Sequence, residues 1–425
     1  MKKMISFLGT SDYKPVGYEF NQKLVVSSFV QIALAEIFQP DEVIVCLTEE
    51  ARTKNWLSQK QQESTADSDK KLEEIASERL PHITFSALDI PAGQSLDEFW
   101  EIFNLLEEKF HDGDTLLVDV THSFRSIPIV TLACTQYLGI LKNVALEGIY
   151  YGAYEARREA EDGTVIAPVF DLTSFAELMH WSQAVAMFEG FGDMGGLRKL
   201  FDQETTPRRK ASKGKDQEAV LLREIARDLD MISQRCATCR GQEIYQDDLF
   251  RRIQEKLLEL EKDFTTGKAF GPLLKRVRSK LQDMQYPYQA ISEEVKRGFE
   301  SVNWCLEHNL VQQAYTLLRE NVVTHFCQLN SFDFSNREKR EMVASALRLY
   351  QKPKEKWDQK ARDNEQEILR VQHSAGQSIC KLYQKLSDRR NDINHAGIGQ
   401  PAKSQTLTRD IHELKDEFMA LLSTC

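Results

Sequence analysis

The chain has 425 residues, enough for two or three domains, and 41% of them are hydrophobic, so sizeable cores can form. Its formal net charge of −10 argues against a protein that coats nucleic acid nonspecifically, because such proteins are usually basic. No apolar run approaches the roughly 20 residues that a membrane-spanning helix requires, and the eight scattered cysteines are typical of a reducing compartment. We therefore expect a cytoplasmic protein, independent of membranes, in which any nucleic-acid chemistry is confined to a local site.

Strand-like and helix-like segments alternate over the first 175 residues. Short β-branched runs predict strands that are buried on both faces, and longer runs with helical periodicity predict helices. In chain order we expect a strand at 4–9, a helix at 23–38, strands at 42–48 and 82–90, a helix at 95–110, a strand at 114–120, a helix at 124–141 and strands at 145–155 and 165–173. This alternation predicts an α/β Rossmann-like domain over residues 1–175, with helices on both faces of a parallel sheet.

Two local signals refine this prediction. Ser95 with Glu98 three residues later is a typical N-cap arrangement for the helix at 95–110. Asp162–Gly163 is a turn signal between the last two strands, which we expect to pair as an antiparallel hairpin.

The rest of the chain is predicted to be all-α. The polar segment 202–217, with Pro207 and Gly214, reads as a linker or exposed loop. Gly271–Pro272 and the YPY sequence at 286–288 interrupt the helical pattern. We therefore predict a helical linker or insertion region at 176–290 and a terminal helical domain at 291–425.

Small hydroxyl side chains follow the first strand and the strand at 114–120. In an open parallel sheet, ligands bind where strands present their carboxyl ends, and hydroxyl groups and helix-start N–H groups can donate to phosphate oxygens. The candidate phosphate donors are Thr10, Ser11, Thr121, Ser123 and Ser126. The alternative is that these residues only cap helices.

Arg125 strengthens the case for an anionic ligand. It falls near the first turn of a helix, where a cation is unfavourable by about 0.3–1 kcal/mol unless an anion lies beside it. The plainer alternative is that Arg125 is solvated or pairs with Asp119, and that His122 is a structural hydrogen-bonding residue. The loop GTSDYKP after the first strand has no GxGxxG pattern, and the chain has no GxxxxGK[ST] pattern, which disfavours NAD-binding and P-loop proteins.

Gly9-Thr10-Ser11, taken with the motif Asp119-Val-Thr-His-Ser-Phe-Arg-Ser126, resembles the ligand-binding part of the CARF domains of CRISPR-associated accessory proteins. The resemblance covers about 175 residues and implies a dimeric Rossmann-like domain that binds a cyclic oligoadenylate messenger. The implied ligand-binding residues are Gly9, Thr10, Ser11, Asp119, Thr121, His122, Ser123, Arg125 and Ser126. The ring size, tetra- or hexa-adenylate, is not readable from these residues, and the family context favours the tetra-adenylate.

The segment RRNDINHAG at 389–397 is the second candidate site. By itself Arg-x4-His is a weak motif, but here it lies in the terminal helical domain and ends at Gly397, which can cap a helix. It resembles the Arg-x4–6-His motif of HEPN ribonuclease domains, with Arg390, Asn391 and His395 in the matching positions. Arg389 also fits the spacing, and Asn391 favours Arg390. Residues 302–320 are similar to the opening HEPN helix of this CRISPR family.

The residue types suit metal-independent RNA cleavage. Histidine can donate or accept a proton near neutral pH, and arginine matches phosphate oxygens. Asn391 and Asn394 could orient the phosphate or the imidazole. At 100° per residue, Arg390 and His395 lie about 140° apart around one helix, so we expect two copies in a homodimer to build one cleft.

The resemblance therefore implies a CRISPR type III antiviral endoribonuclease, activated by cyclic oligoadenylate and without a metal or other cofactor. Its single-stranded RNA products would carry 2′,3′-cyclic phosphate and 5′-hydroxyl ends. Three alternatives remain: a messenger-controlled transcription regulator, a ring nuclease that mainly degrades its own messenger, and a binding scaffold with an inactive terminal domain.

Two further patterns have plainer explanations. Cys236 and Cys239 form a CxxC, but no second pair exists at zinc-site spacing. The basic run 335–362 reads as a solvated helical face, with guidance of RNA to the terminal cleft as the alternative.

Overall fold

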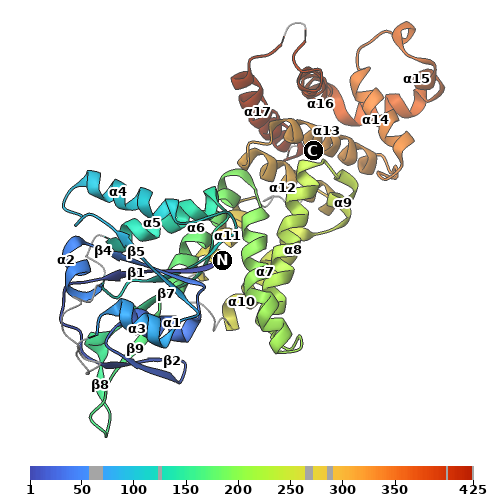
Figure 1. Cartoon of the computed structure of the whole chain (residues 1–425). Helices are drawn as coiled ribbons and strands as arrows, with labels where there is room; N and C mark the ends of the chain where they lie inside the picture. The colour runs from blue at the N-terminus through green and yellow to red at the C-terminus, as the bar shows by residue number, and fades with distance from the viewer. Residues whose placement is uncertain (57–69, 123–126, 264–270, 285–290, 399–400, 424–425) are drawn as a thin grey trace. The chain divides into compact units, whose positions relative to one another are not determined.

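The fold is known from a computed structural model, in which the chain forms two compact units, Met1–Glu177 and Leu178–Cys425 (Figure 1). The structure describes residues 1–56, 70–122, 127–263, 271–284, 291–398 and 401–423.

The first unit is built around a mixed sheet with the strand order β3-β2-β9-β7-β6-β1-β4-β5, and β8 pairs with β9. The strands are β1 (Lys2–Leu8), β2 (Val16–Phe20), β3 (Lys23–Ser27), β4 (Glu42–Leu47), β5 (Thr84–Asp89), β6 (Thr115–Asp119), β7 (Ala145–Gly152), β8 (Arg158–Glu159) and β9 (Val165–Asp171). Pairing is parallel from β7 through β6, β1 and β4 to β5, and antiparallel between β7 and β9, as the hairpin prediction required.

Helices cover both faces of this sheet (Figure 1). They are α1 (Val30–Phe38), α2 (Glu49–Ala51), the π-helix η1 (Arg52–Trp56), α3 (Leu72–Arg79), α4 (Leu96–Glu108), α5 (Ile127–Leu141) and the 3₁₀ turn η2 (Tyr154–Ala156). Alternate residues of each strand point to opposite faces. Met4 of β1 therefore joins a core with α1 and α3, while Ile5 joins the core of α4 and α5.

The predicted helix at 23–38 is wrong in its first third. Residues Lys23–Ser27 form β3, which pairs with the unpredicted strand β2, and the helix begins at Val30. Asn21 and Gln22 both have positive φ (48° and 68°), the conformation of a tight two-residue hairpin turn. The pairing partner overrides the helical periodicity, and the β-branched Val25 and Val26 suit a strand.

In the second part of the chain, every regular element that the structure describes after β9 is a helix. The helices are α6 (Thr173–Phe191), α7 (Gly195–Ala211), α8 (Gln217–Ala237), α9 (Gly241–Gln246), α10 (Leu249–Asp263), α11 (Gly271–Asp283), α12 (Glu293–Glu307), α13 (Val311–Leu329), α14 (Arg337–Arg348), the 3₁₀ turn η3 (Lys354–Lys356), α15 (Gln359–Asp363), α16 (Glu365–Asn394) and α17 (Ser404–Ser423). The predicted fold class, an α/β domain followed by an all-helical region, is confirmed. One core cluster extends from α6 to α17, and the boundary near residue 290 stays a prediction.

The predicted linker at 202–217 is largely helical. Its first ten residues belong to α7, which runs through Pro207 to Ala211. Leu197, Phe201 and Thr205, spaced by four, are buried along one side of this helix, so packing outweighs the polar composition. The loop that remains ends at Asp216, whose carboxylate accepts from Ala219 N at 2.9 Å and caps α8.

Among the described helices, none combines the length and apolar character needed to cross a bilayer.

The buried His308 and the partly buried His325 make the helical unit sensitive to acid. Burial lowers the pKa of His308, beside Lys280, and that of His325 to about 4. Both are therefore neutral when folded but would take up a proton at a pKa of about 6.5 when unfolded. The contribution of these two neutral histidines to the free energy of unfolding is fully present above about pH 6.5. It decreases as the pH falls towards 4, and by pH 5 about 2 kcal/mol per histidine is lost.

His325 packs against Phe326 and Phe418, with ring centroids 5.0 and 6.2 Å away. In His325→Phe, we expect the drop in unfolding free energy between about pH 7 and pH 5 to shrink by about 2 kcal/mol. Urea unfolding at the two pH values measures it, with the exposed His373→Phe as the matched control. An equally steep drop in His325→Phe and in the parent would contradict this assignment.

Candidate functional site

The two predicted ligand loops follow neighbouring parallel strands, β1 and β6. β1 ends at Leu8 and leads into Gly9, Thr10 and Ser11, while β6 ends at Asp119 and leads into Thr121 and His122. The structure thus brings these six predicted residues to one edge of the sheet. Thr10 is partly exposed and Ser11 is exposed, so both are accessible to a ligand. The predicted residues Ser123, Arg125 and Ser126 lie outside the described residues.

Asp119 acts inside the protein. It is fully buried and accepts hydrogen bonds from Ser6 Oγ at 2.5 Å, Thr121 N at 2.9 Å and Thr121 Oγ1 at 2.5 Å. Thr121 Oγ1 in turn accepts from Gly152 N at 2.8 Å. Burial raises the pKa of Asp119, and the bonds from Ser6 and Thr121 oppose that rise. These contacts hold the turn after β6 against β1 and β7.

Tyr13 connects the two loops. Its hydroxyl oxygen accepts a hydrogen bond from Gly9 N at 2.9 Å, and its ring lies 4.8 Å from the His122 ring between centroids. Burial raises the pKa of Tyr13 to about 12. Burial also lowers the pKa of His122, while the negative charge of Asp119 opposes that shift. The side chains of Tyr13 and His122 therefore pack together beside the strand ends and are largely shielded from water.

Asn55 is a positioning residue that the sequence reading missed. Its side-chain amide, at the end of η1, donates to the carbonyl oxygens of Gly9 at 2.8 Å and Ser11 at 3.0 Å. The first loop is therefore held from both sides, by Asn55 and by Tyr13. No local pattern marks Asn55, because it lies more than 40 residues along the chain from its partners.

Replacing Asn55 with alanine is expected to loosen the first loop. Both hydrogen bonds are lost and two carbonyl oxygens lose their partner, at a local cost of about 1–3 kcal/mol. Hydrogen exchange of the amides from Thr10 to Tyr13 should become correspondingly faster. Asn104→Ala, at an exposed position of α4, is the matched control, and equal exchange in the two variants would show that the loop holds its shape without Asn55.

The second candidate site lies at the end of α16. The helix closes at Asn394 with His395 as its C-cap, and the amides of Ala396 and Gly397 donate to the carbonyls of Ile393 and Asp392. This bonding pattern is a Schellman motif. Gly397 thus takes part in the predicted helix end, although Ala396 is the first residue with a left-handed φ, of 57°. The motif leaves His395 on an exposed helix end.

The two neighbouring arginines have different surroundings. Arg389 forms an ion pair with the buried Asp410, with Nε and Nη2 each 2.9 Å from Oδ2. Arg390 instead meets neutral amides: Nη1 lies 3.4 Å from Asn391 Oδ1. With the Asn394 amide turned so that its oxygen faces the guanidinium, this oxygen lies 3.0 Å from Arg390 Nε. Asn391 and Asn394 therefore orient Arg390, whose guanidinium forms no ion pair with a carboxylate of the described residues.

The CxxC pair belongs to the helical unit. Cys236 is buried against Ser301, and burial raises the pKa of Cys239. Among the residues that the structure describes, no three His, Cys, Asp or Glu side chains are grouped to hold a metal ion.

One of two comparisons with known proteins concerns the first unit alone, and the other covers both units. Residues 3–155 match the family described as CRISPR system endoribonuclease Csx1, CARF domain. The first unit is therefore similar to a CARF domain over most of its length. The chain is also similar to CRISPR-associated protein MJ1674 of Methanocaldococcus jannaschii, with 25% identity over an alignment that covers 97% of this chain. It spans 65% of the length of that relative. Together the two matches support a CRISPR-associated protein with an N-terminal CARF domain.

Proposed function

We propose that the protein is a ribonuclease of CRISPR type III defence, switched on by a cyclic oligoadenylate that binds at the strand-end loops of the CARF domain. The match of residues 3–155 to the Csx1 CARF domain supports the sensor part. Thr10 and Ser11 are accessible at this edge, and Asn55 and Tyr13 hold their loop in shape. Cyclic tetra-adenylate is the first messenger to test, and hexa-adenylate the second.

The ribonuclease part depends on one observation: Arg390 forms no ion pair with any carboxylate that the structure describes, and it lies on the helix end that also presents His395. In the proposed reaction, the 2′-oxygen attacks phosphorus and the bond to the 5′-oxygen breaks. His395 moves the proton, and Arg390 stabilises the charge on the phosphate oxygens. The products are a 2′,3′-cyclic phosphate and a 5′-hydroxyl, and no metal is required for these steps.

The active form is proposed to be a homodimer. Arg390 and His395 point about 140° apart on one helix, so a second copy is needed to surround one phosphodiester. The outer face of α5 supports association: the helix carries no charged residue, and Ile129 and Ile140 are 72% and 85% exposed. Apolar side chains exposed to this extent favour burial against a second copy.

The decisive experiment is cleavage of labelled single-stranded RNA with EDTA present, across a panel of cyclic oligoadenylates. We expect one ring size to activate cleavage and the products to carry cyclic phosphate ends. Loss of cleavage in EDTA would overturn the metal-independent mechanism. Messenger-dependent binding of duplex DNA without RNA cleavage would favour the transcription regulator, and consumption of the messenger alone would favour the ring nuclease.

A further inference from the structure

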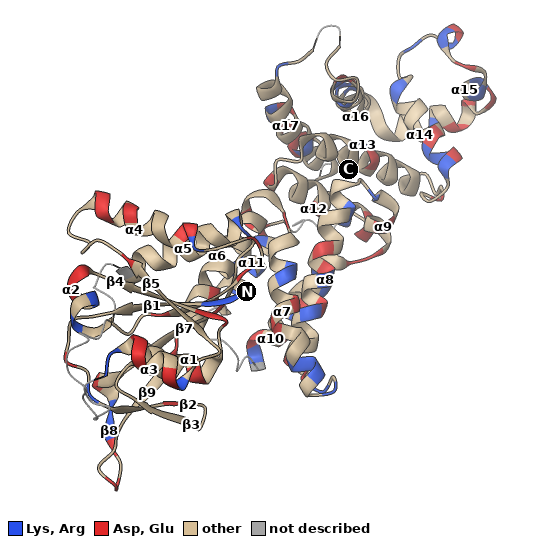
Figure 2. Cartoon of the chain, viewed as in Figure 1, with Lys and Arg blue, Asp and Glu red and all other residues tan. Residues whose placement is uncertain are grey.

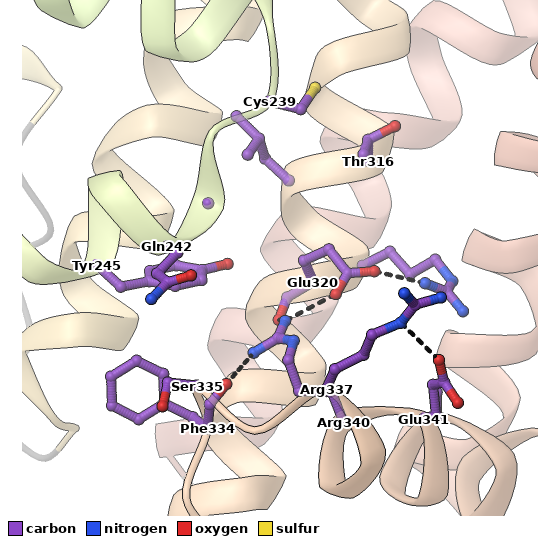
Figure 3. A pocket seen from close by; sticks show the side chains of 14 residues that line it. Cys239, Gln242, Tyr245, Thr316, Glu320, Phe334, Ser335, Arg337, Arg340 and Glu341 are labelled. Atoms are coloured by element: carbon purple, nitrogen blue, oxygen red, sulfur yellow. Dashed lines mark hydrogen bonds and ion pairs between the residues drawn. The ribbon is translucent and has the colours of Figure 1, made fainter.

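A cavity of about 430 Å³ lies in the helical unit, between the loop before α9, α9 itself, α13 and the start of α14 (Figure 3). Its volume is in the range of small-ligand sites. Cys239 and Thr316 lie at one end of the view, and Arg337 and Arg340 at the other. None of the residues assigned to the two candidate sites above lines this cavity.

One face of α13 leads from the end of α16 to the cavity. The side-chain amides of Gln312 and Asn394 meet at 3.2 Å. Thr316 and Glu320, which line the cavity, follow Gln312 at successive intervals of four residues, and each interval advances about 6 Å along the same helix face. The positive charge of Arg390 also acts on the thiol of Cys239, another lining residue, opposing the rise of its pKa on burial. The cavity is therefore adjacent to Arg390.

The chemistry of the walls suits a nucleotide. Three arginines face two glutamates there, an excess of positive charge in a protein of net charge −10. Two of the arginines are occupied: Arg340 Nη2 lies 2.7 Å from Glu320 Oε2, and Arg319 Nη1 lies 2.6 Å from Glu320 Oε1. Arg337 is different, since its side chain is 91% exposed and its partner is the nearby Glu341 at 2.9 Å.

Glu341 can release Arg337 without being left unpaired. Its other oxygen lies 2.9 Å from Lys360 Nζ, so a phosphate can replace Glu341 as the partner of Arg337. An exposed pair of this kind contributes little to stability. The cavity also contains aromatic surface: Phe334 is partly exposed and stands edge-on to the buried Tyr245, with centroids 6.3 Å apart.

A second cavity, of about 300 Å³, continues on the other side of α14. It shares Arg319, Glu341 and Ala344 with the first, and among charged residues it adds Arg348, Lys360 and Asp358. Basic and acidic residues are interspersed on α14 and α15 (Figure 2), so this part of the chain is not uniformly basic. The basic run 335–362 thus supplies residues to a track that begins near Arg390.

We propose that the two cavities bind the single-stranded RNA substrate beside the cleaved phosphodiester. Arg337 and Arg348 contact phosphates of the strand, and the Phe334 ring packs against a base. This inference depends on the proposed ribonuclease function for the identity of the strand, and it assigns the residues that hold the substrate in register. Aromatic packing and phosphate contacts together are the usual means of binding a single strand.

The test is equilibrium binding of a fluorescent single-stranded RNA to the messenger-bound His395→Ala protein, in which cleavage cannot obscure binding. Arg337→Ala should weaken binding roughly five-fold and reduce the slope of log affinity against log salt by about 0.7. Phe334→Leu, which keeps an apolar side chain, should weaken binding at least about five-fold with an unchanged salt slope. Arg251→Ala is the matched control, because Arg251 is an exposed residue of α10 that pairs with Asp248 and Glu255 in the same way.

The outcomes separate this inference from the function on which it rests. If the unmodified protein cleaves RNA but Arg337→Ala and Phe334→Leu bind it as tightly as Arg251→Ala does, the substrate track is overturned and the ribonuclease stands. If the unmodified protein cleaves no RNA, yet Arg337→Ala and Phe334→Leu weaken RNA binding and Arg251→Ala does not, the track is supported and the cleavage proposal fails.

Discussion

Replacing His395 with alanine is expected to lower messenger-activated RNA cleavage by about 100- to 10,000-fold, the usual contribution of a positioned proton-transfer group. Replacing Arg390 with alanine should have an effect of similar size, because the phosphate charge then loses its partner. Both side chains lie at the exposed end of α16, so neither change should disturb the core. Cleavage rates and binding of labelled messenger, measured side by side, check this expectation: the rate falls and messenger affinity is retained.

His412→Ala is the matched control, since His412 is an exposed histidine on the neighbouring helix α17. A mixed dimer makes the test sharper. If two chains share one cleft, a dimer of one Arg390→Ala chain and one His395→Ala chain keeps one arginine and one histidine. It should recover part of the activity that both parent variants lack. A mixed dimer that binds messenger but remains inactive would contradict the shared cleft.

Arg389→Ala should lower the stability of the protein, whereas Arg390→Ala should lower the rate of RNA cleavage. Arg389 neutralises Asp410, which is 3% exposed. Burial opposes ionisation of Asp410, but Lys385 and Arg389 outweigh this effect and hold the pKa of the carboxyl below its usual range. Removing Arg389 leaves a buried carboxylate with Arg409 as a more distant partner at 3.4 Å. We expect a loss of about 2–3 kcal/mol in unfolding free energy, somewhat below the usual cost of breaking a buried pair.

Urea unfolding of Arg389→Ala and Arg390→Ala measures the contrast, and Arg390→Ala should stay within about 0.5 kcal/mol of the parent. The double variant Arg389→Gln/Asp410→Asn removes both charges and should recover much of the lost stability. Equal stability of the two single variants would show that the Arg389–Asp410 pair contributes nothing. A cleavage defect in Arg389→Ala that disappears once the protein is fully folded would agree with a structural role.

Strong local patterns made several elements predictable. The strand at 114–120 is buried on both faces, and its β-branched, apolar run indicates that position in a sheet. Ser95 accepts from Glu98 N at 3.2 Å, as the N-cap pattern predicted, because a cap depends on residues only three apart. The parallel order of the strands places the loops after β1 and β6 at one edge, which the sequence also predicted.

Other features depend on contacts between distant residues. Lys23–Ser27 is a strand because β2 pairs with it, and α7 runs through Pro207 because its apolar side packs into the core. The hydrogen bonds of Asn55 and the track beside α14 likewise join segments far apart in the chain.

The sequence by itself determined the α/β-then-helical order, the strand-end loops and the Arg-x4-His segment, because each arises from spacing along a few residues. The sequence favoured Arg390 over Arg389 only through the neighbouring Asn391, and the tertiary structure gave the physical difference between them. The two are chemically identical and adjacent in sequence, and they differ in what α17 and the end of α16 place beside them: the carboxylate of Asp410 for one, and neutral amides for the other.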